Sequence, residues 1–435
     1  MKKSLILQSN SLWATGITAL FLAMLQAASA QAASYWVAPD GNDHAAGSLE
    51  QPFASIHRAQ KAVQPGDTVY LRGGRYELTE AHISRKYKIW AYLHVLDKSG
   101  RPGKPITYRP HEQERPIFDC SQVKPAGLRI DAFYITGSWL HLQGIEVTGV
   151  QVTMKGHTQS ICFDSNGSHN IFEGLRMHDG QAIGIYHVRG SNNLFLNCDA
   201  WNNWDYTSEK GKGGNVDGFG CHPTKGSTGN VFRGCRAWYN SDDAFDLISA
   251  HEVVILEDCW ALYSGRSAKG DKLGDGNGFK AGGFGNLRAK DLPRPIPRHI
   301  IRNCIAAGNP SSGFYANHHP GGIDWVNNSA FRNGTNFNLL GRLGDNQTDV
   351  DGYGHTLRNN VSYHARGGIS RIDRSRCALD NNAFAPEAAL NDQDFVSLDE
   401  TELLGPRRAD GGLPAIHFLQ LSSKSPYSGR GAPSP

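Results

Sequence analysis

A short phrase recurs along most of this chain: a run of alternating apolar and polar residues, a glycine, asparagine or aspartate, and a second short run. The residues at the centres of successive phrases are separated by 23, 37, 24, 45, 25, 32 and 22 positions. A basal step of about 22–25 residues with occasional insertions is typical of a solenoid, in which each coil is one repeat and extra residues form loops. The central residues are Gly174, Asn197, Gly234, Asp258, Asn303, Asn328, Asn360 and Asn382.

The runs on either side of the central residue are only three to five residues long, which is typical of short, half-buried strands. Glycine and asparagine tolerate the left-handed backbone of tight corners, and the 50 glycines are about 11 % of the 435 residues, against a usual ~7 %. A leucine-rich consensus is absent, and propeller blades are about twice as long. The repeats therefore predict an all-β fold, a single-domain parallel β-helix of about ten coils.

Three segments follow from where the repeats begin and end. Residues 1–30 are expected to be a secretory signal peptide, and residues 31–382 a parallel β-helix with an N-terminal cap that includes a helix ending near Ala62. A helix over the open end of the stack protects its edge strands. Residues 383–435 lose the repeat and are expected to form an irregular C-terminal tail that packs on the β-helix.

The N-terminus has the three parts of an export signal. Two lysines precede an apolar stretch, Leu12 to Ala27, and the small residues at 28–30 predict cleavage near Ala30. The product is then secreted, extracellular or periplasmic, with a net charge of +1. A nearly neutral chain without a second long apolar segment predicts neither a nucleic-acid partner nor a membrane partner.

Four cysteines share one position in successive coils, and we expect them to form an inward-facing ladder of Cys198, Cys235, Cys259 and Cys304. Buried free thiols are one interpretation and disulfides between neighbouring coils the other, because an exported protein meets an oxidising compartment. The sequence has no Cys-x-x-Cys pair, which would have indicated a zinc site. The remaining cysteines are Cys120, Cys162, Cys221 and Cys377.

Acidic residues gather in two neighbouring coils. Asp217 precedes Gly218-Phe219, and one coil later Asp243 precedes Ala244-Phe245, so the two segments should stack. Asp242 and Asp246 flank the second segment, and four converging carboxylates repel one another unless a cation is bound. Oxygen ligands favour Ca²⁺ over zinc. The alternative is that each aspartate caps its own turn.

The next coil repeats the Gly-Phe pair and places Lys280 where the earlier coils carry acid. A lone lysine on a sheet is usually a solvated surface residue. Lys280, however, is in line with the acidic cluster. A metal bound there would lower the pKa of Lys280 and let its neutral amine accept a proton.

These motifs resemble polysaccharide lyase family 9, the pectate lyases with a right-handed parallel β-helix. The resemblance extends over nearly the whole chain after residue 30 and includes Asn-Val-Asp-Gly-Phe, Asn-Ser-Asp-Asp-Ala-Phe-Asp and Gly-Asn-Gly-Phe-Lys. It implies that Asp217, Asp242, Asp243 and Asp246 bind a catalytic Ca²⁺ and that Lys280 is the Brønsted base. The activity that it implies is a calcium-dependent pectate lyase, a monomer that cleaves an acidic polysaccharide, polygalacturonate, by β-elimination.

Several residues near this site are candidates without an assigned role. Basic residues lie in the insertions, and His222 and Arg342 are further possible substrate ligands, while Asp392, Asp394 and Asp399 are candidates for additional calcium sites. The basic residues are Lys210, Lys212, Lys269, Lys272, Arg288 and Lys290, in loops that include one long insertion around Arg266–Arg298.

Three other functions remain open from the sequence. A lyase acting on rhamnogalacturonan or another polyuronate uses the same chemistry. A β-helix glycoside hydrolase would use Asp217 with Asp242 or Asp243 as acid and base, but its usual Gly-His-Gly and Arg-Ile-Lys elements are not found in order. A non-catalytic carbohydrate-binding β-helix has no need of Lys280 beside the acids.

Overall fold

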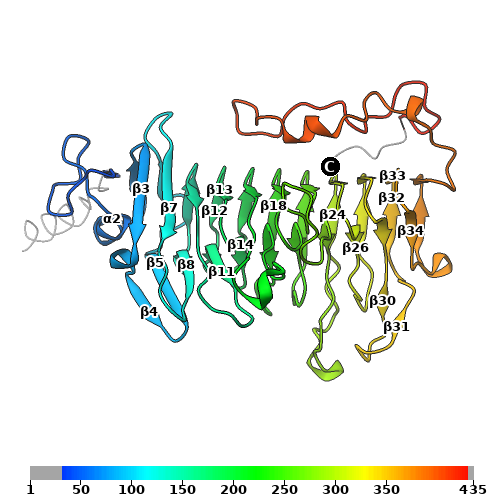
Figure 1. Ribbon diagram of the computed structural model, residues 1–435, viewed down its shortest axis with the longest axis horizontal. Coiled ribbons are helices and arrows are strands. Elements are labelled where there is room, and N and C mark those ends of the chain that lie inside the picture. The colour runs from blue at the N-terminus through cyan, green and yellow to red at the C-terminus, as the bar shows by residue number, and fades with distance from the viewer. Residues whose placement is uncertain (1–31, 430–435) are drawn as a thin grey trace, which may run out of the picture.

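The computed structural model describes residues 32–429, so the predicted signal peptide lies outside the described residues. The chain winds into a right-handed parallel β-helix with three long sheets, and its axis runs horizontally in Figure 1. Sheet A contains twelve strands. In stack order they are β1 (Ser34–Val37), β2 (Thr68–Leu71), β6 (Ile106–Pro110), β9 (Leu140–Gln143), β12 (Ile171–Glu173), β15 (Leu194–Leu196), β18 (Asn230–Arg233), β21 (Val254–Glu257), β24 (Ile300–Arg302), β27 (Asp324–Val326), β32 (Thr356–Arg358) and β35 (Ala378–Asp380).

Sheets B and C have eleven strands each, close to the ten coils predicted. Sheet B contains β3 (Gly74–Thr79), β7 (Pro116–Gln122), β10 (Glu146–Thr148), β13 (Arg176–His178), β16 (Asp199–Trp201), β19 (Arg236–Trp238), β22 (Trp260–Leu262), β25 (Ile305–Ala307), β28 (Ser329–Phe331), β33 (Val361–Tyr363) and β36 (Ala383–Phe384). Sheet C contains β4 (Arg85–Tyr87), β5 (Trp90–Leu96), β8 (Arg129–Ile135), β11 (Ser160–Ser165), β14 (Ala182–His187), β17 (Phe219–Cys221), β20 (Phe245–Asp246), β23 (Phe279–Lys280), β26 (Ser312–Tyr315), β29 (Thr335–Asn338) and β34 (Gly367–Ser370).

Identical side chains stack from coil to coil inside the helix. On sheet C, the rings of Phe219, Phe245 and Phe279 are stacked with centroids 4.9 Å apart, and the row continues through Phe314 and Phe337. This separation matches the strand spacing of about 4.8 Å, so each ring lies over the next without a change of rotamer. The phenylalanines are fully buried and form the centre of the core.

The inward cysteine ladder is confirmed. Cys198, Cys235, Cys259 and Cys304 are buried, and all eight cysteines, which lie within the described residues, are free thiols. The ladder then continues as asparagine, because the side-chain oxygen of Asn328 accepts a hydrogen bond from the backbone N–H of Cys304 at 3.0 Å.

The structure corrects the corner position in the last three repeats by one residue. The left-handed residues that follow Asn303 (φ 56°) are Asn327, Asn359 and Asn381, with φ of 55°, 55° and 51°. Asn328, Asn360 and Asn382 do not form the corners, but they form a ladder of stacked amides that extends the cysteines, as expected for asparagines that recur at one position of successive coils. Asn328 Nδ2 donates to Asn360 Oδ1 at 3.1 Å.

The insertions are also divided differently from the prediction. The segment around Arg266–Arg298 is two loops, 263–278 and 281–299, and β23 lies between them. A third loop, 202–218, joins β16 to β17. The hairpin of β30 (Gly341–Arg342) and β31 (Asp349–Val350) projects from the stack on the lower side in Figure 1.

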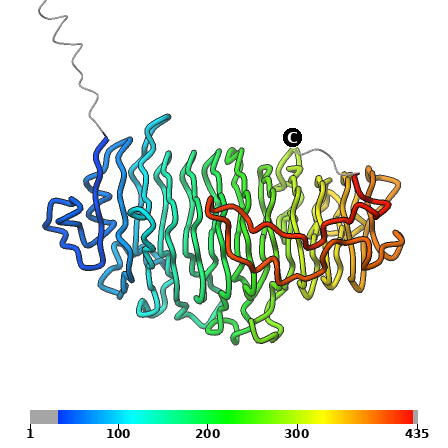
Figure 2. Tube along the Cα trace, turned by 90° about the horizontal axis from the view of Figure 1, so that it is seen from above, coloured from blue at the N-terminus to red at the C-terminus, as the bar shows by residue number. Residues whose placement is uncertain are grey.

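Both ends of the stack carry additional structure. Helix α2 (Ile56–Ala62) begins at the N-cap Ser55, whose side chain accepts from Arg58 N, and it packs at the N-terminal end. After β36, the tail runs back along the stack over sheet B, as Figures 1 and 2 show. Its Phe395, Leu403 and Phe418 pack on the outer face of sheet B, including Phe331 and Tyr363. Short 3-10 turns occur at Glu80–His82, Glu209–Gly211, Ala289–Asp291, Arg374–Arg376, Asp392–Asp394 and Glu400–Leu404.

An ion-pair network anchors the tail to the middle of the stack. Asp199 accepts from Arg236 at 2.9 Å and from Arg407 at 2.7 Å, and all three side chains are at most 11 % exposed. Arg236 also donates to the carbonyl oxygens of Leu403 and Gly405. Within residues 32–429, no helix is long and apolar enough to cross a membrane.

We expect Arg407→Ala to lower the free energy of unfolding by about 3 kcal/mol, because it leaves the buried Asp199 carboxylate with one partner instead of two. Chemical denaturation measures this change, and limited proteolysis should cut the released tail. The control is Arg408→Ala, which removes an arginine that is 58 % exposed and should cost less than about 1 kcal/mol. Equal effects of the two variants would contradict the anchoring role.

Candidate active site

Two consecutive inward residues determine which side chains sheet C shows to solvent. Ala244 and Phe245 both belong to the core, and at the equivalent point one coil earlier a side chain on Gly218 would meet Ala237 Cβ at 2.5 Å. Alternation along the strand is therefore interrupted, and the residue before this pair and the residue after it both face outward. This explains why Asp243 and Asp246, three positions apart, share one face.

The acidic cluster assembles from two adjacent coils, as predicted. The backbone N–H of Gly218 donates to Asp243 O, and Gly220 pairs with Asp246, which pairs with Lys280. One carboxylate oxygen from each of Asp217, Asp242 and Asp243 lies within 4.8 Å of the others. Asp246 is not part of this group of three. It is connected to the group by Lys280, whose Nζ contacts both Asp243 and Asp246.

Backbone amides hold the acidic side chains in place. Asp242 accepts from Asn215 N and from Asp275 N, both at 2.8 Å, so loops 202–218 and 263–278 each fix one of its oxygens. Asp217 Oδ1 accepts from Asp243 N at 3.1 Å. Asp243 Oδ1 accepts from both the backbone N–H and the side-chain amide of Asn277, at 2.7 and 2.9 Å.

Lys280 bridges two of the acids. Its Nζ lies 3.1 Å from Asp243 Oδ2 and 3.1 Å from Asp246 Oδ2, and its side chain is 13 % exposed. Asp243 Oδ2 is fully buried and accepts no hydrogen bond within the described residues. Its negative charge is balanced by the ion pair with Lys280.

Burial raises the pKa values of the acids. Burial and the neighbouring carboxylates raise the pKa of Asp217 well above its usual value, and burial raises the pKa of Asp243 to about 8 despite the nearby ammonium. Burial also raises the pKa of Asp242. For Lys280, burial alone lowers the pKa, but the four carboxylates outweigh it and the net change is upward. Without another cation, Lys280 is therefore an ammonium ion.

The donor set fits a hard divalent cation. Three buried carboxylates meet in one place, and Asp243 has an oxygen without a hydrogen-bond donor among the described residues. Ca²⁺ prefers carboxylate oxygens, and the absence of histidine and cysteine from this group argues against zinc. Without a cation, the repulsion among these carboxylates is offset by the Lys280 ammonium and by the backbone N–H groups that donate to them.

Sequence reasoning missed three features of this face. Asn277 occupies the position equivalent to Asp217 and Asp243 in the next coil and holds Asp243. The buried pair Asp131 and Asp164 occupies the same two outward positions in earlier coils. The phrases Asp131-Ala132-Phe133 and Phe163-Asp164 repeat the pattern of Asp243-Ala244-Phe245-Asp246, a signal that was present in the sequence.

Asp131 and Asp164 are two buried carboxyl groups in adjacent coils. Burial and then the neighbouring carboxylate raise the pKa of Asp131, and burial raises the pKa of Asp164 to about 6. Asp164 Oδ1 also accepts from Asn166 Nδ2 at 2.6 Å.

The remaining candidates are dispersed. Arg342 is held by Asp349 at 2.8 Å, and His318 binds the same carboxylate. Asp392 accepts from Tyr363, and Asp399 caps its own turn, both in the tail that packs on sheet B. The predicted basic loop residues are all exposed: Lys210, Lys212, Lys269, Lys272, Arg288 and Lys290.

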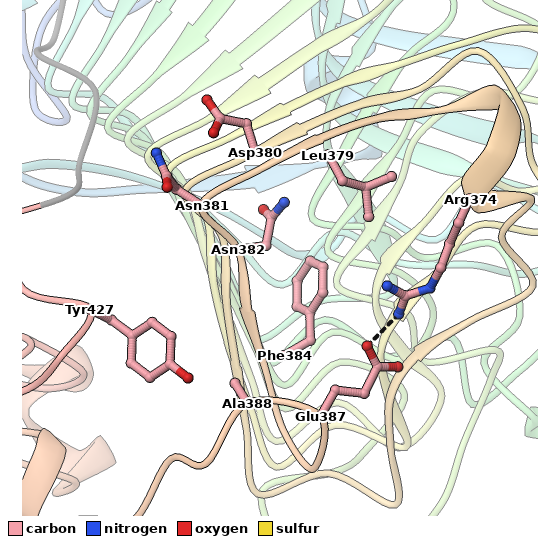
Figure 3. Close-up of a pocket in the computed structure, with 9 residues that line it drawn as sticks. All are labelled: Arg374, Leu379, Asp380, Asn381, Asn382, Phe384, Glu387, Ala388 and Tyr427. Carbon is pink, nitrogen blue, oxygen red and sulfur yellow. Dashed lines mark hydrogen bonds and ion pairs between the residues drawn. The ribbon is translucent and has the colours of Figure 1, made fainter.

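A hollow of about 340 Å³ at the C-terminal end of the stack is unrelated to this chemistry. Figure 3 shows Asn382 and Phe384 of the last coil lining it, with Tyr427 on one side and the Arg374–Glu387 ion pair on the other. Its titratable groups are paired and exposed, and it lies where the last coil has no successor.

Comparison with known proteins agrees with the fold. The family described as "Pel9A-like, right handed beta helix region" matches residues 35–360. Pectate lyase L of Dickeya dadantii (strain 3937) is 33 % identical over 395 residues, covering 90 % of this chain and 84 % of that protein. The structure of a rhamnogalacturonan lyase superposes with a TM-score of 0.86 at 44 % identity, covering 90 % of this chain and 96 % of that one. The structure of pectate lyase Pel9A gives a TM-score of 0.72 at 31 % identity, covering 91 % and 90 %.

A parallel β-helix with these relatives defines a polysaccharide lyase. The chain belongs to the Pel9A-like β-helix family, polysaccharide lyase family 9, as its motifs predicted. The glycoside hydrolase and the non-catalytic binding protein are thereby set aside.

We expect Asp217→Asn to stabilise the calcium-free protein at pH 8 and to leave it unchanged at pH 4. An acid whose pKa is raised by folding stabilises the fold below its unfolded pKa, and that contribution is lost as pH rises towards the folded value. The gain at pH 8 should be at least about 1 kcal/mol, measured by chemical denaturation.

Added Ca²⁺ should then stabilise the wild-type protein more than Asp217→Asn. The control is Asp271→Asn, an exposed acid in loop 263–278, which should change neither quantity. A variant no more stable than the wild type at pH 8 without calcium would show that the cluster is not under electrostatic strain.

Proposed function

We propose that this protein is a calcium-dependent lyase that cleaves the galacturonate backbone of pectin by β-elimination. Lys280 is the base, and Asp217, Asp242, Asp243 and Asp246 hold the Ca²⁺. The observation that carries the proposal is the lysine amine 3.1 Å from two acids of a buried carboxylate cluster, on the outer face of a β-helix.

The reaction removes the proton on C5 of a galacturonate residue. The electron pair of the C5–H bond forms a double bond between C4 and C5, the bond from C4 to the glycosidic oxygen breaks, and that oxygen takes a proton from water. The ionised carboxylate on C5 makes this proton a weak acid. A bound Ca²⁺ supplies charge neutralisation of the uronate carboxylate.

Two opposing influences on Lys280 make it suited to accept this proton. The carboxylates raise its pKa, while burial lowers it. Once the carboxylates are engaged with a divalent cation, burial is the main influence that remains, and it favours the neutral amine. The amine then has a lone pair on the face where a polysaccharide binds.

Two pectic backbones are candidate substrates. Polygalacturonate is the substrate that the family resemblance implies, and the related pectate lyases are about one-third identical to this chain. Rhamnogalacturonan is the second candidate, because the rhamnogalacturonan lyase is 44 % identical and superposes with the higher TM-score.

We further propose that the protein acts as an exported monomer. The signal in residues 1–30 supports cleavage near Ala30. Mass spectrometry of the exported chain should give a mass that starts near Gln31, and a retained N-terminus would contradict export by this route.

A lyase assay tests the reaction directly. The new C=C bond conjugated to the carboxylate absorbs ultraviolet light, and hydrolysis products do not. We expect absorbance to rise with polygalacturonate or rhamnogalacturonan, to stop with a calcium chelator, and to return with added Ca²⁺. Activity that is indifferent to chelator would exclude the calcium role, and reducing ends without absorbance would exclude elimination.

Lys280→Met should lower kcat by at least about 100-fold in that assay, because general-base catalysis contributes about 10²–10⁴. The uncharged side chain also leaves the four acids without their counter-ion, so folding is checked in Ca²⁺ by circular dichroism. Lys424→Met, an exposed lysine in the tail, is the control and should retain full activity. More than a tenth of wild-type activity in Lys280→Met would remove Lys280 from the base role.

A further inference from the structure

The outward row that contains Asp246 and Lys280 continues along sheet C towards the N-terminus. In register, Lys280 pairs with Asp246, Asp246 with Gly220, Gly220 with Tyr186 and Tyr186 with Asp164. Neighbouring strands are about 4.8 Å apart. Each coil therefore advances by about the length of one sugar residue. Successive sugar residues of an extended polysaccharide along this row would face successive positions of the row.

The position next to the acidic cluster has an aromatic floor. Gly220 has no side chain, and a Cβ there would come within 2.8 Å of His222 Nε2 and 2.9 Å of Tyr186 Cδ2. The two rings thus close over Gly220, with their centroids 4.9 Å apart. Both side chains are half-buried, so part of each remains accessible to a ligand.

His222 is oriented by the neighbouring coil. Its Nδ1 lies 2.7 Å from the carbonyl oxygen of Ile248, and because a carbonyl only accepts, Nδ1 carries the hydrogen. Nε2 is then the acceptor, and it has no hydrogen-bond partner among the described residues. Burial lowers the pKa of His222, in agreement with a neutral ring that accepts through Nε2.

The charges around these rings are unfavourable for an anion. Burial, and then the carboxylates of Asp164, Asp217 and Asp246, raise the pKa of the Tyr186 hydroxyl to about 12, and Arg129 acts in the opposite sense. At the cluster itself, one divalent cation is shared among four acids, so it leaves no free positive charge for a second uronate. A uronate placed over Tyr186 and His222 therefore meets no counter-charge, but a neutral acceptor and an aromatic surface.

We propose that Tyr186 and His222 form a subsite for an uncharged sugar, directly beside the uronate that is cleaved. The inference rests on the proposed lyase function and names its substrate class: a polymer in which galacturonate alternates with a neutral sugar. The Tyr186 ring packs against the apolar face of this sugar, and Nε2 of His222 accepts a hydrogen bond from one of its hydroxyl groups. In polygalacturonate the same subsite receives a second carboxylate.

The experiment compares two oligosaccharides of equal length, one alternating galacturonate with rhamnose and one of galacturonate alone. We expect the wild-type protein to show a kcat/KM at least tenfold higher for the alternating oligosaccharide. His222→Lys places a cation in the subsite and should lower this ratio at least tenfold. A wild-type ratio of one or less, or a ratio unchanged in His222→Lys, would overturn the inference.

Two further variants separate a specific effect from a general one. His251→Lys makes the same substitution on a histidine outside the row and should leave the ratio unchanged. Gly220→Ala adds a Cβ between the two rings and should weaken cleavage of the alternating oligosaccharide without adding charge. If His222→Lys does not fold, as judged by circular dichroism, Gly220→Ala and His222→Ala carry the test, and unchanged ratios in both would overturn the inference.

Failure of the proposed function gives a different result. If neither oligosaccharide yields an ultraviolet-absorbing product, the lyase proposal is wrong in its substrate or chemistry. Calorimetric titration of the same two oligosaccharides then tests whether the subsite prefers an uncharged sugar. Tighter binding of the alternating one supports it, and equal or tighter binding of the oligogalacturonate overturns it.

Discussion

Stacking of identical side chains from coil to coil is the constraint on which the rest of this structure depends. Phe219, Phe245 and Phe279 can stack only if their strands stay in register, because a slip of one residue would move each ring away from the ring of the next coil. The same register brings Asp217, Asp243 and Asn277, which are far apart in the sequence, into one row, with Asp246 and Lys280 beside it. The geometry of the site is thus a by-product of the packing of the core.

Electrostatics act against this packing at one place. Burying Asp217, Asp242 and Asp243 together raises their pKa values, and the Lys280 ammonium offsets only part of the repulsion. The cluster is supported by coils on both sides, where the phenylalanine row and backbone amides keep the strands in place. A solenoid tolerates such strain in its interior coils, because each coil is stabilised by two neighbours.

The sequence predicted the fold and the convergence of the acids because both follow from residues that recur at the same point of successive coils. Gly218-Phe219, Ala244-Phe245 and Gly278-Phe279 mark the same point in three coils, so the alignment of Asp217 with Asp243, and of Asp246 with Lys280, could be derived without coordinates. The corner position failed where two asparagines are adjacent, as at 327–328, because either one tolerates a left-handed backbone. The long insertion was not divided, because β23 is only two residues long. The orientation of His222 depends on the carbonyl of Ile248, one coil away, and no local pattern encodes such a contact.

The anchored tail also changes how this solenoid can unfold. Repeat proteins without such a tail lose their terminal coils first, because each coil depends only on its neighbours. Here Arg407 joins Asp199 across 208 positions of the sequence, so the segment after the last coil is fastened to the middle of the stack. The chain from Asp199 to Arg407 is thereby closed into a loop by an ion pair. This loop contains the coils that follow β16, including the coil that carries Lys280. Fraying from the C-terminal end must break this loop, which couples the integrity of the terminal coils to that of the coils that carry the chemistry.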